Sequence, residues 1–345
     1  MTAALRVLEP GLMTTVQDLG RPRFQSLGVP VSGALDTTAL RAANIVAGNE
    51  QGTAAIEMMV LGPSIEVAAD SVLVALAGAG AALEVSSSDG RRTILTLRSV
   101  RLTRGDRVRC VGLDQAGVAY LAVGGGFDLA PFLGSRSTYV RAGLGGMDGR
   151  AIRVGDLLPL NELDVAEGVE RTGRGLDLAR PSVLRVLVGE DGIDFSAEAV
   201  ATFLGGRFVV SAAADRMGLR LDGPRFDRAG AGESLSEAIA PGAIQVPPDG
   251  QPILLRADRQ TVGGYPRIAH VISADIPAAG RLRPGDAIRF AAVGMAEAVA
   301  ARASLEQAIA QFGVRIDDRG GIPEIDDAAL MAENLVSGVF VGDES

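Results

Sequence analysis

A polar segment, residues 258–267, carries the densest set of chemically active side chains. It reads Asp-Arg-Gln-Thr-Val-Gly-Gly-Tyr-Pro-Arg and lies between two apolar stretches. Asp258 can act as a general acid or base, while Arg259 and Arg267 can each grip a carboxylate or phosphate through two parallel hydrogen bonds. The tandem Gly263 and Gly264 let the backbone approach a ligand closely. These residue types predict a site for an anionic or amide-bearing small molecule.

Three more side chains of this segment complete the predicted site. Gln260 and Thr261 are expected to donate hydrogen bonds to the substrate. Tyr265 is a candidate catalytic residue, whose ring could form a wall of the site or whose hydroxyl could donate a hydrogen bond.

A second charged pair, Asp215 and Arg216, lies in residues 214–224 (ADRMGLRLDGP). If Asp215 and Asp258 share a cleft, one carboxylate can serve as the base while an arginine neutralises the other. The alternative is a surface turn whose adjacent opposite charges have no catalytic meaning.

Near the N-terminus, Ser32 and Gly33 precede a helix that is predicted over residues 36–47. Free N–H groups and the macrodipole at a helix N-terminus attract anions, so these two residues are candidate substrate contacts. Simple capping of the helix is the alternative. Glu57 lies between apolar residues and needs a partner if it is buried.

Composition excludes several classes of function. The net charge of −9 argues against a nucleic-acid partner and against an anionic membrane surface. All 33 basic residues are arginine, so the chain offers no lysine for a Schiff base, a Walker-type phosphate loop or the attachment of biotin. One cysteine, Cys110, and one histidine, His270, predict neither a disulfide framework nor a metal site.

No signal-peptide core or membrane-spanning run is found, which predicts a cytoplasmic protein. Glycines and prolines divide the chain into short apolar pieces that are typical of β-strands. The clearest predicted strands are residues 65–67, 71–77, 92–97, 107–111, 118–123, 183–188, 253–256, 268–273 and 287–290. A second helix is predicted over residues 295–312.

The length predicts two domains. We expect an N-terminal domain over residues 1–165, an exposed linker over 166–180, a C-terminal domain with a terminal helix over 181–313, and a loosely ordered acidic tail over 314–345 with a short helix near 328–335.

Four motifs together resemble one family. Residues 14–22 (TTVQDLGRP), 214–224, 241–250 (PGAIQVPPDG) and 258–267 are similar to the allophanate hydrolase subunit 2 / Kip-type group, a carboxyltransferase-like family that includes the C subunit of 5-oxoprolinase. The resemblance covers residues 5–292 and implies a mainly β fold with two cyclophilin-like β-barrel domains and a few helices. Arg267 stands where relatives often have lysine, which alters the geometry of that cation.

The resemblance also implies an activity and partners. It is closest to the C subunit of an ATP-dependent 5-oxoprolinase, which opens the 5-oxoproline lactam to L-glutamate with A-type and B-type subunits and uses ATP as co-substrate. Two alternatives remain: a carboxyltransferase component of a biotin-dependent, urea carboxylase-like system, or a non-enzymatic Kip-type regulator that binds a B-type partner.

Overall fold

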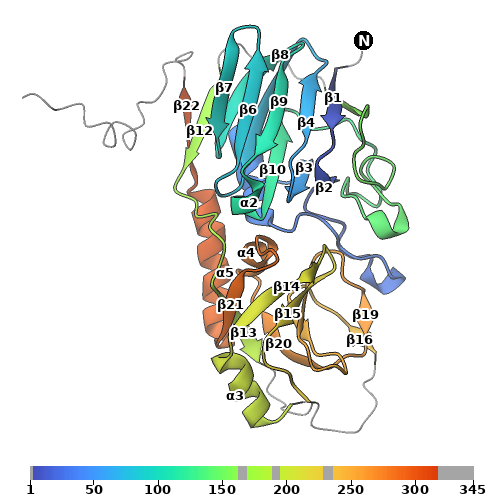
Figure 1. Ribbon diagram of the computed structural model, residues 1–345, viewed down its shortest axis with the longest axis vertical. Helices are drawn as coiled ribbons and strands as arrows, with labels where there is room; N and C mark the ends of the chain where they lie inside the picture. The colour runs from blue at the N-terminus through green and yellow to red at the C-terminus, as the bar shows by residue number, and fades with distance from the viewer. Residues whose placement is uncertain (1–2, 162–168, 189–194, 228–235, 318–345) are drawn as a thin grey trace, which may run out of the picture.

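The computed structural model describes residues 3–161, 169–188, 195–227 and 236–317, and it is mostly β-structure. Two lobes follow each other along the long axis of the molecule (Figure 1). The N-terminal lobe contains two antiparallel sheets, and the C-terminal lobe is a closed barrel. The mainly β class that the sequence predicts is confirmed.

Six strands form one sheet of the N-terminal lobe. In spatial order they are β11 (Leu157–Pro159), β1 (Ala4–Glu9), β4 (Ser64–Val67), β9 (Arg107–Val111), β6 (Ala82–Ser87) and β7 (Gly90–Leu95). The other sheet has seven strands: β2 (Leu12–Gln17), β3 (Ala55–Met59), β10 (Val118–Val123), β5 (Ser71–Ala77), β8 (Arg98–Thr103), β12 (Glu170–Arg174) and β22 (Gly313–Asp317). One apolar core joins the two sheets, with Val7 and Leu83 from the first and Met58 and Leu76 from the second.

The central strand β10 is buried on both faces. Its alternate residues Leu121 and Val123 enter the core between the sheets, whereas Tyr120 and Ala122 face the helix α1 (Thr37–Ala47). A strand sends successive side chains to opposite faces, so the unbroken apolar run of β10 serves two packing layers.

Helix α1 covers the outer face of the seven-stranded sheet and confirms the first predicted helix. Asp36 is its N-cap: the carboxylate accepts hydrogen bonds from the N–H groups of Thr38 (2.9 Å) and Ala39 (3.1 Å). Gly48 ends the helix in the left-handed region, with φ of 81°. Because Asp36 occupies these N–H groups, the helix end is capped, which was the alternative to an anion site there.

The C-terminal lobe closes into a barrel. Around it the strands are β13 (Val183–Val188), β20 (Arg267–Val271), β17 (Ala243–Gln245), β18 (Ile253–Leu255), β15 (Gly218–Asp222), β14 (Phe208–Ala214) and β21 (Ala287–Ala292), and β13 pairs in parallel with β21. Helix α3 (Ala197–Gly205) inserts Phe203 into the barrel core, where its ring stacks on Phe290 at 4.5 Å between centroids. Outside the barrel, β16 (Glu237–Ala238) and β19 (Val262–Gly263) form a small two-stranded antiparallel sheet.

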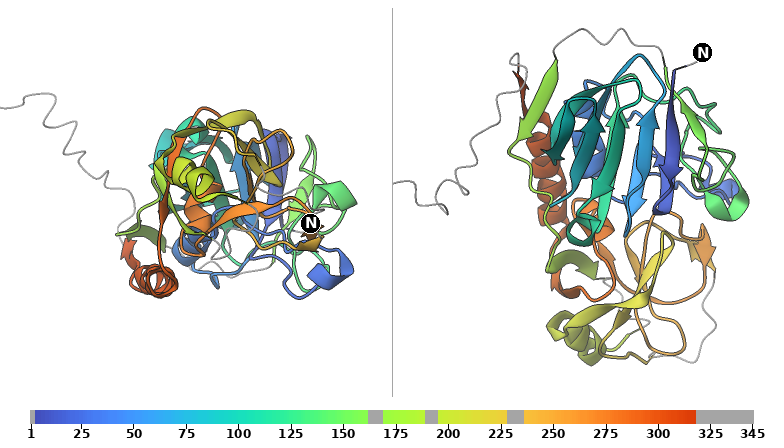
Figure 2. Two further views of the ribbon diagram at one scale, coloured as in Figure 1. Left: turned by 90° about the horizontal axis from the view of Figure 1, so that it is seen from below. Right: turned by 45° about the horizontal axis from the view of Figure 1, so that its top comes forward.

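The remaining helices connect the lobes or lie in loops. They are α2 (Leu113–Ala116), α4 (Ile276–Gly280), α5 (Met295–Ala310) and the 3₁₀ turns η1 (Gln25–Leu27) and η2 (Val140–Ala142). α5 confirms the second predicted helix and runs along the flank of both lobes, as the views of Figures 1 and 2 agree. Each predicted strand coincides with or overlaps an observed one. In the part of the chain that the structure describes, no helix is long and apolar enough to span a membrane.

Two segments differ from expectation. Part of the expected linker forms β12, and the start of the expected tail forms β22, which pairs with β12 at the edge of the seven-stranded sheet, for example Thr172 with Arg315. β22 is the edge strand of this sheet, and β12 lies between β22 and β8. Gly173 of β12 is buried, and a Cβ there would lie 2.3 Å from the Phe312 ring. The helix expected near residues 328–335 lies outside the described residues, and the domain boundaries stay a prediction.

One buried ion pair ties α1 to the barrel. Arg281, which follows α4, contacts the Asp36 carboxylate at 2.6 Å, and both side chains are buried. Next to it Gly280 packs against the backbone of Leu35, where a Cβ would lie only 2.1 Å from the carbonyl oxygen. The same carboxylate therefore begins α1 and joins the two lobes.

Replacing Asp36 with Ala should lower the free energy of unfolding by about 3–5 kcal/mol, because it removes a cap and leaves Arg281 as a buried cation without its carboxylate. Ser196→Ala is the matched control: Ser196 caps α3 through a 3.1 Å bond from Ala199 N–H and has no cation to neutralise. That variant should lose only about 1 kcal/mol. Urea unfolding of both proteins measures the difference, and equal losses would show that the ion pair contributes nothing.

Cys110 supports a second prediction about the fold. It lies buried in β9 against the core between the sheets, and burial raises the pKa of its thiol to about 12. Because the thiolate is the reactive form, the native protein should resist thiol reagents between about pH 7 and 9 and react after unfolding in denaturant. Fast labelling of the native protein in this range would contradict the buried position.

Candidate functional site

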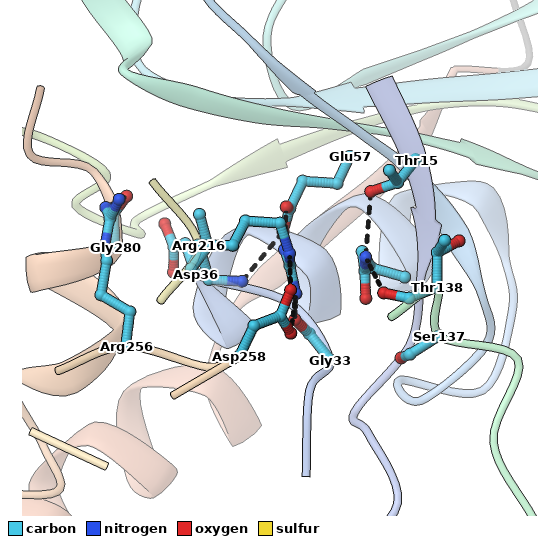
Figure 3. Close-up of polar contacts among 12 residues, drawn as sticks. Thr15, Gly33, Asp36, Glu57, Ser137, Thr138, Arg216, Arg256, Asp258 and Gly280 are labelled. Carbon is cyan, nitrogen blue, oxygen red and sulfur yellow. Dashed lines mark hydrogen bonds and ion pairs between the residues drawn. The ribbon is translucent and has the colours of Figure 1, made fainter. Parts of the chain in front are cut away.

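The candidate site lies at the seam between the lobes and centres on Arg216. This buried guanidinium binds Asp258 through two hydrogen bonds, Nε to Oδ2 at 2.8 Å and Nη2 to Oδ1 at 3.2 Å. Its Nη1 contacts Glu57, and its Nη2 also donates to the carbonyl of Gly33 at 2.6 Å. Arg216 therefore joins a carboxylate from each lobe (Figure 3).

Glu57 supplies the N-terminal half of this arrangement from strand β3. It is fully buried, and its Oε2 accepts hydrogen bonds from the Tyr120 hydroxyl at 2.6 Å and from Leu35 N–H at 2.9 Å. Tyr120 lies directly opposite Glu57 in the β3–β10 ladder, which brings the two side chains together. The partner that a buried Glu57 requires is thus Arg216, together with two neutral donors.

Burial and neighbouring charge oppose each other in their effect on the pKa of Arg216, and they act together on the pKa of Tyr120. Desolvation alone would lower the pKa of Arg216, but the negative charges of Glu57 and Asp258 raise it well above its ordinary value. The pKa of Tyr120 is raised, first by burial and then by the charge of Glu57. Both side chains therefore stay protonated throughout the physiological range.

Asp258 and Asp215 have different surroundings. Asp258 is buried and paired with Arg216, and its backbone N–H donates to the Arg216 carbonyl at 2.9 Å. Asp215 is exposed, and its Oδ1 accepts from the N–H groups of Met217 (2.7 Å) and Gly218 (3.1 Å) in its own turn. The structure thus brings Arg216 to Asp258 and uses the Asp215 carboxylate as a turn cap.

A cavity of about 150 Å³ opens beside this ion-paired group and is formed by both lobes. Its polar lining residues are Ser32, Thr37, Arg256 and Arg259. The rest of the wall is apolar or backbone: Leu19, Val31, Ala34, Leu35, Pro241, Gly242, Leu254, Leu255, Ala257, Ile276, Ala279 and Gly280. The cavity suits a small ligand with a compact apolar body and a polar end.

Arg259 is the most unusual group in this wall. Its side chain is only 1% exposed, and its Nε donates to the Ile239 carbonyl at 2.9 Å. Neither Nη1 nor Nη2 has a hydrogen-bond partner among the described residues, and burial lowers the pKa of the guanidinium to about 10. The group still carries its charge at neutral pH, so the wall contains a buried cation with free donors.

Arg256 adds a second buried cation. Its Nη2 donates to the carbonyls of Gly280 (2.5 Å) and Ala279 (3.2 Å) at the end of α4, where partial negative charge accumulates. Desolvation lowers its pKa to about 10, and within the described ranges no carboxylate forms an ion pair with it. The cavity is therefore bordered by two positive charges that backbone carbonyls balance only in part.

Ser32 faces the same cavity from the N-terminal lobe. It is buried, it has a φ of 54°, and its hydroxyl finds no partner in the part of the chain that is described. Gly33 follows with a φ of 82° and packs so tightly on Gly20 that a Cβ would lie 2.7 Å from the backbone nitrogen. Ser32 and Arg259, two predicted contacts that lie far apart in sequence, thus line one cavity, while Gly33 accepts from Arg216.

The other predicted residues of the 258–267 segment lie outside this cavity wall. Gln260 and Tyr265 are exposed, and Arg267 pairs with Glu237 of β16. Thr261 uses its carbonyl to accept from Ile239 N–H at 3.0 Å. Gly263 ends strand β19 and Gly264 follows it, and neither glycine lines the cavity.

Gly263 has a packing role instead of a direct ligand contact. A Cβ at this position would lie 2.5 Å from the Ile239 side chain and 2.7 Å from the Gln260 amide nitrogen. The missing side chain lets strand β19 pack closely against Ile239, whose carbonyl accepts a hydrogen bond from Arg259.

Sequence reasoning missed Arg256, which it placed only as the end of a predicted strand. The available signal was a charged residue directly after the apolar run Ile253–Leu255 and two residues before Asp258. Within the described ranges, no group of three His, Cys, Asp or Glu residues could hold a metal ion.

Comparison with known proteins places the chain among carboxyltransferase-like proteins. It is 34% identical over 316 residues to the C subunit of 5-oxoprolinase from Escherichia coli (strain K12), which covers 90% of this chain and 98% of the relative. It is 31% identical over 330 residues to urea amidolyase of Lachancea kluyveri, covering 89% of this chain and 18% of that protein.

Solved structures agree with these relatives. The crystal structure of the K. lactis urea amidolyase superposes with a TM-score of 0.82 at 26% identity, over 95% of this chain and 20% of that chain. A crystal structure of TTHA0988 gives a TM-score of 0.73 at 35% identity, over 84% of this chain, which spans about half (55%) of the solved one.

The family model for the carboxyltransferase domain, subdomain A and B, matches residues 27–292. This range contains Glu57, Arg216, Asp258 and every residue of the cavity wall except Leu19. The chain therefore belongs to the carboxyltransferase domain (subdomain A and B) family, which confirms the resemblance that its motifs carry.

Proposed function

We propose that this chain is the C subunit of an ATP-dependent 5-oxoprolinase and acts with A-type and B-type subunits to open 5-oxoproline to L-glutamate. The observation that carries the proposal is the cavity at the seam, where a buried guanidinium with two free Nη groups borders an apolar wall. 5-Oxoproline has the matching parts, a carboxylate on a compact five-membered lactam. The similarity to the 5-oxoprolinase C subunit of Escherichia coli, over nearly the full length of both chains, supports the same activity.

The reaction requires activation of a resonance-stabilised amide. In the proposed sequence the γ-phosphoryl group of ATP moves to the lactam oxygen and ADP leaves. A first water then adds to the carbon and the C–N bond breaks, which leaves ring-opened γ-glutamyl phosphate. A second water hydrolyses this acyl phosphate to glutamate and inorganic phosphate. We assign to Asp258 the role of accepting a proton from the first water. Its carboxylate is held by Arg216, and its sequence neighbours Ala257 and Arg259 line the cavity. Arg259 is a fixed hydrogen-bond donor, so it can bind the anionic substrate without a rearrangement of the protein.

A second candidate is a carboxyltransferase component that works with a biotinylated partner. The specific support is the superposition on urea amidolyase over 95% of this chain. Since the chain contains no lysine, biotin would have to be carried by the partner. Urea is neutral and has no carboxylate for Arg259, which favours the 5-oxoprolinase proposal.

The decisive experiment is co-expression of the three subunits, purification of their complex, and measurement of glutamate release from 5-oxoproline with and without ATP. We expect ATP-dependent turnover. A properly assembled complex without it would refute the proposal, and urea-dependent consumption of ATP with a biotinylated partner would support the second candidate.

Asp258→Asn should reduce turnover of the assembled complex by at least ~10²-fold, because an amide cannot accept the proton from water. Folding should persist, since the volume is nearly unchanged and Arg216 keeps its contact with Glu57. The control is Asp249→Asn at an exposed aspartate that pairs with Arg220 at 2.6 Å, and it should leave turnover within about twofold of wild type. Unchanged turnover in Asp258→Asn would remove this carboxylate from the chemistry.

A further inference from the structure

We propose that Arg259 and Ser32 form a carboxylate-binding subsite that is complete in this chain alone, without its partner subunits. The inference rests on the proposed function for the choice of ligand, 5-oxoproline, and extends it by assigning one part of the substrate to one pair of side chains. It begins from the two Nη groups of Arg259 and the Oγ of Ser32, which are buried and have no partner in the described structure. Both residues line the same cavity.

The free groups of Arg259 have the geometry that a carboxylate requires. Nε is already used by the Ile239 carbonyl at 2.9 Å, which leaves Nη1 and Nη2 side by side at the end of the guanidinium. Two parallel N–H donors of this kind match the two oxygens of a carboxylate. The Ser32 hydroxyl offers one more donor from the opposite lobe.

The position of the guanidinium is set by contacts from both lobes. The Ile239 carbonyl also accepts from Gln25 Nε2, which belongs to the N-terminal lobe, at 3.1 Å. Ile239 is itself buried, and its N–H donates to the Thr261 carbonyl at 3.0 Å. Arg259 is thus held before a ligand arrives, so little side-chain entropy is lost on binding.

The dimensions of the cavity define the class of ligand. A volume of about 150 Å³ corresponds to only a few water molecules at roughly 30 Å³ each. This is too small for a nucleotide, and the apolar wall formed by Val31, Leu254 and Leu255 disfavours a multiply charged ion. A monoanionic acid with a small ring fits both limits.

A structural role for Arg259 does not account for its surroundings. Arg216 and Arg281 contact buried carboxylates, and Arg256 donates through Nη2 to the carbonyls of Gly280 and Ala279. In the described structure Arg259 differs from these three, because both of its Nη atoms lack any partner, and a buried charge is costly unless it is paired and hydrogen-bonded. The missing anion is expected to come from the ligand.

The test is isothermal titration of the isolated full-length chain with 5-oxoproline, 2-pyrrolidinone, inorganic phosphate and ATP. 2-Pyrrolidinone is the same lactam without the carboxylate. We expect 5-oxoproline to bind, and 2-pyrrolidinone to bind roughly 100-fold more weakly because it lacks the charged hydrogen bonds. Equal binding of the two lactams, or binding of phosphate or ATP but not of 5-oxoproline, would overturn the subsite.

Variants identify the residues. Arg259→Gln should weaken 5-oxoproline binding roughly 100-fold, and Arg259→Lys, which keeps the charge but loses the paired donors, roughly 10-fold. Ser32→Ala should have a smaller effect in the same direction. The control Arg289→Gln removes an exposed arginine whose side chain donates to the Gly205 carbonyl, and it should bind normally. If Arg259→Gln fails to fold, the lysine variant decides, because normal binding by that folded protein would overturn the inference.

The outcome separates this inference from the proposed function. If the isolated chain binds 5-oxoproline through Arg259 but the assembled complex shows no ATP-dependent turnover, the subsite stands and the proposed activity fails. If the complex turns over while the isolated chain shows no binding, the activity stands and the subsite is refuted.

Discussion

The buried guanidinium of Arg216 is the contact on which the seam between the lobes depends. The carboxylates of Glu57 and Asp258 stabilise this buried cation, and the Gly33 carbonyl accepts a further hydrogen bond from it. One carboxylate comes from each lobe, so the electrostatics of the pair also determine how the lobes meet. Asp36 and Arg281 form a second buried ion pair between the lobes, in which the N-terminal lobe supplies the carboxylate and the C-terminal lobe supplies the cation.

These pairs place the walls of the cavity. Glu57 accepts from the backbone of Leu35, and Arg216 donates to the carbonyl of Gly33, so the turn that carries Ser32 is held against the barrel. On the barrel side, Asp258 lies next in sequence to Arg259, and pairing of the first with Arg216 brings the second to the edge of the cavity. The ion pairs of Arg216 thus position Arg259, whose guanidinium has free donors. An anion can bind to such a fixed group with little rearrangement of the protein.

Local patterns made much of the architecture predictable. The apolar run of β10 and the Asp36 cap with Gly48 beyond the helix are properties of neighbouring residues, so the sequence indicates them directly. β12 and β22 were not predictable in this way, because these two charged segments pair with each other although more than a hundred residues separate them in the chain. The segment of Gly263 looked like a ligand loop for a related reason: a glycine that lets a backbone approach a ligand and one that lets it approach Ile239 have the same appearance in sequence.

The sequence by itself determined the class of the fold, its family, and the segment from which the acid and the free cation come. Only the tertiary structure decided which arginine is neutralised and which is available. Arg216 and Arg259 have identical side chains and each adjoins an aspartate in sequence, yet the partner of the first is Glu57, 159 positions away, and the second has free Nη groups. Ion pairing depends on distance and burial in three dimensions, and neither quantity is a property of a residue and its neighbours along the chain.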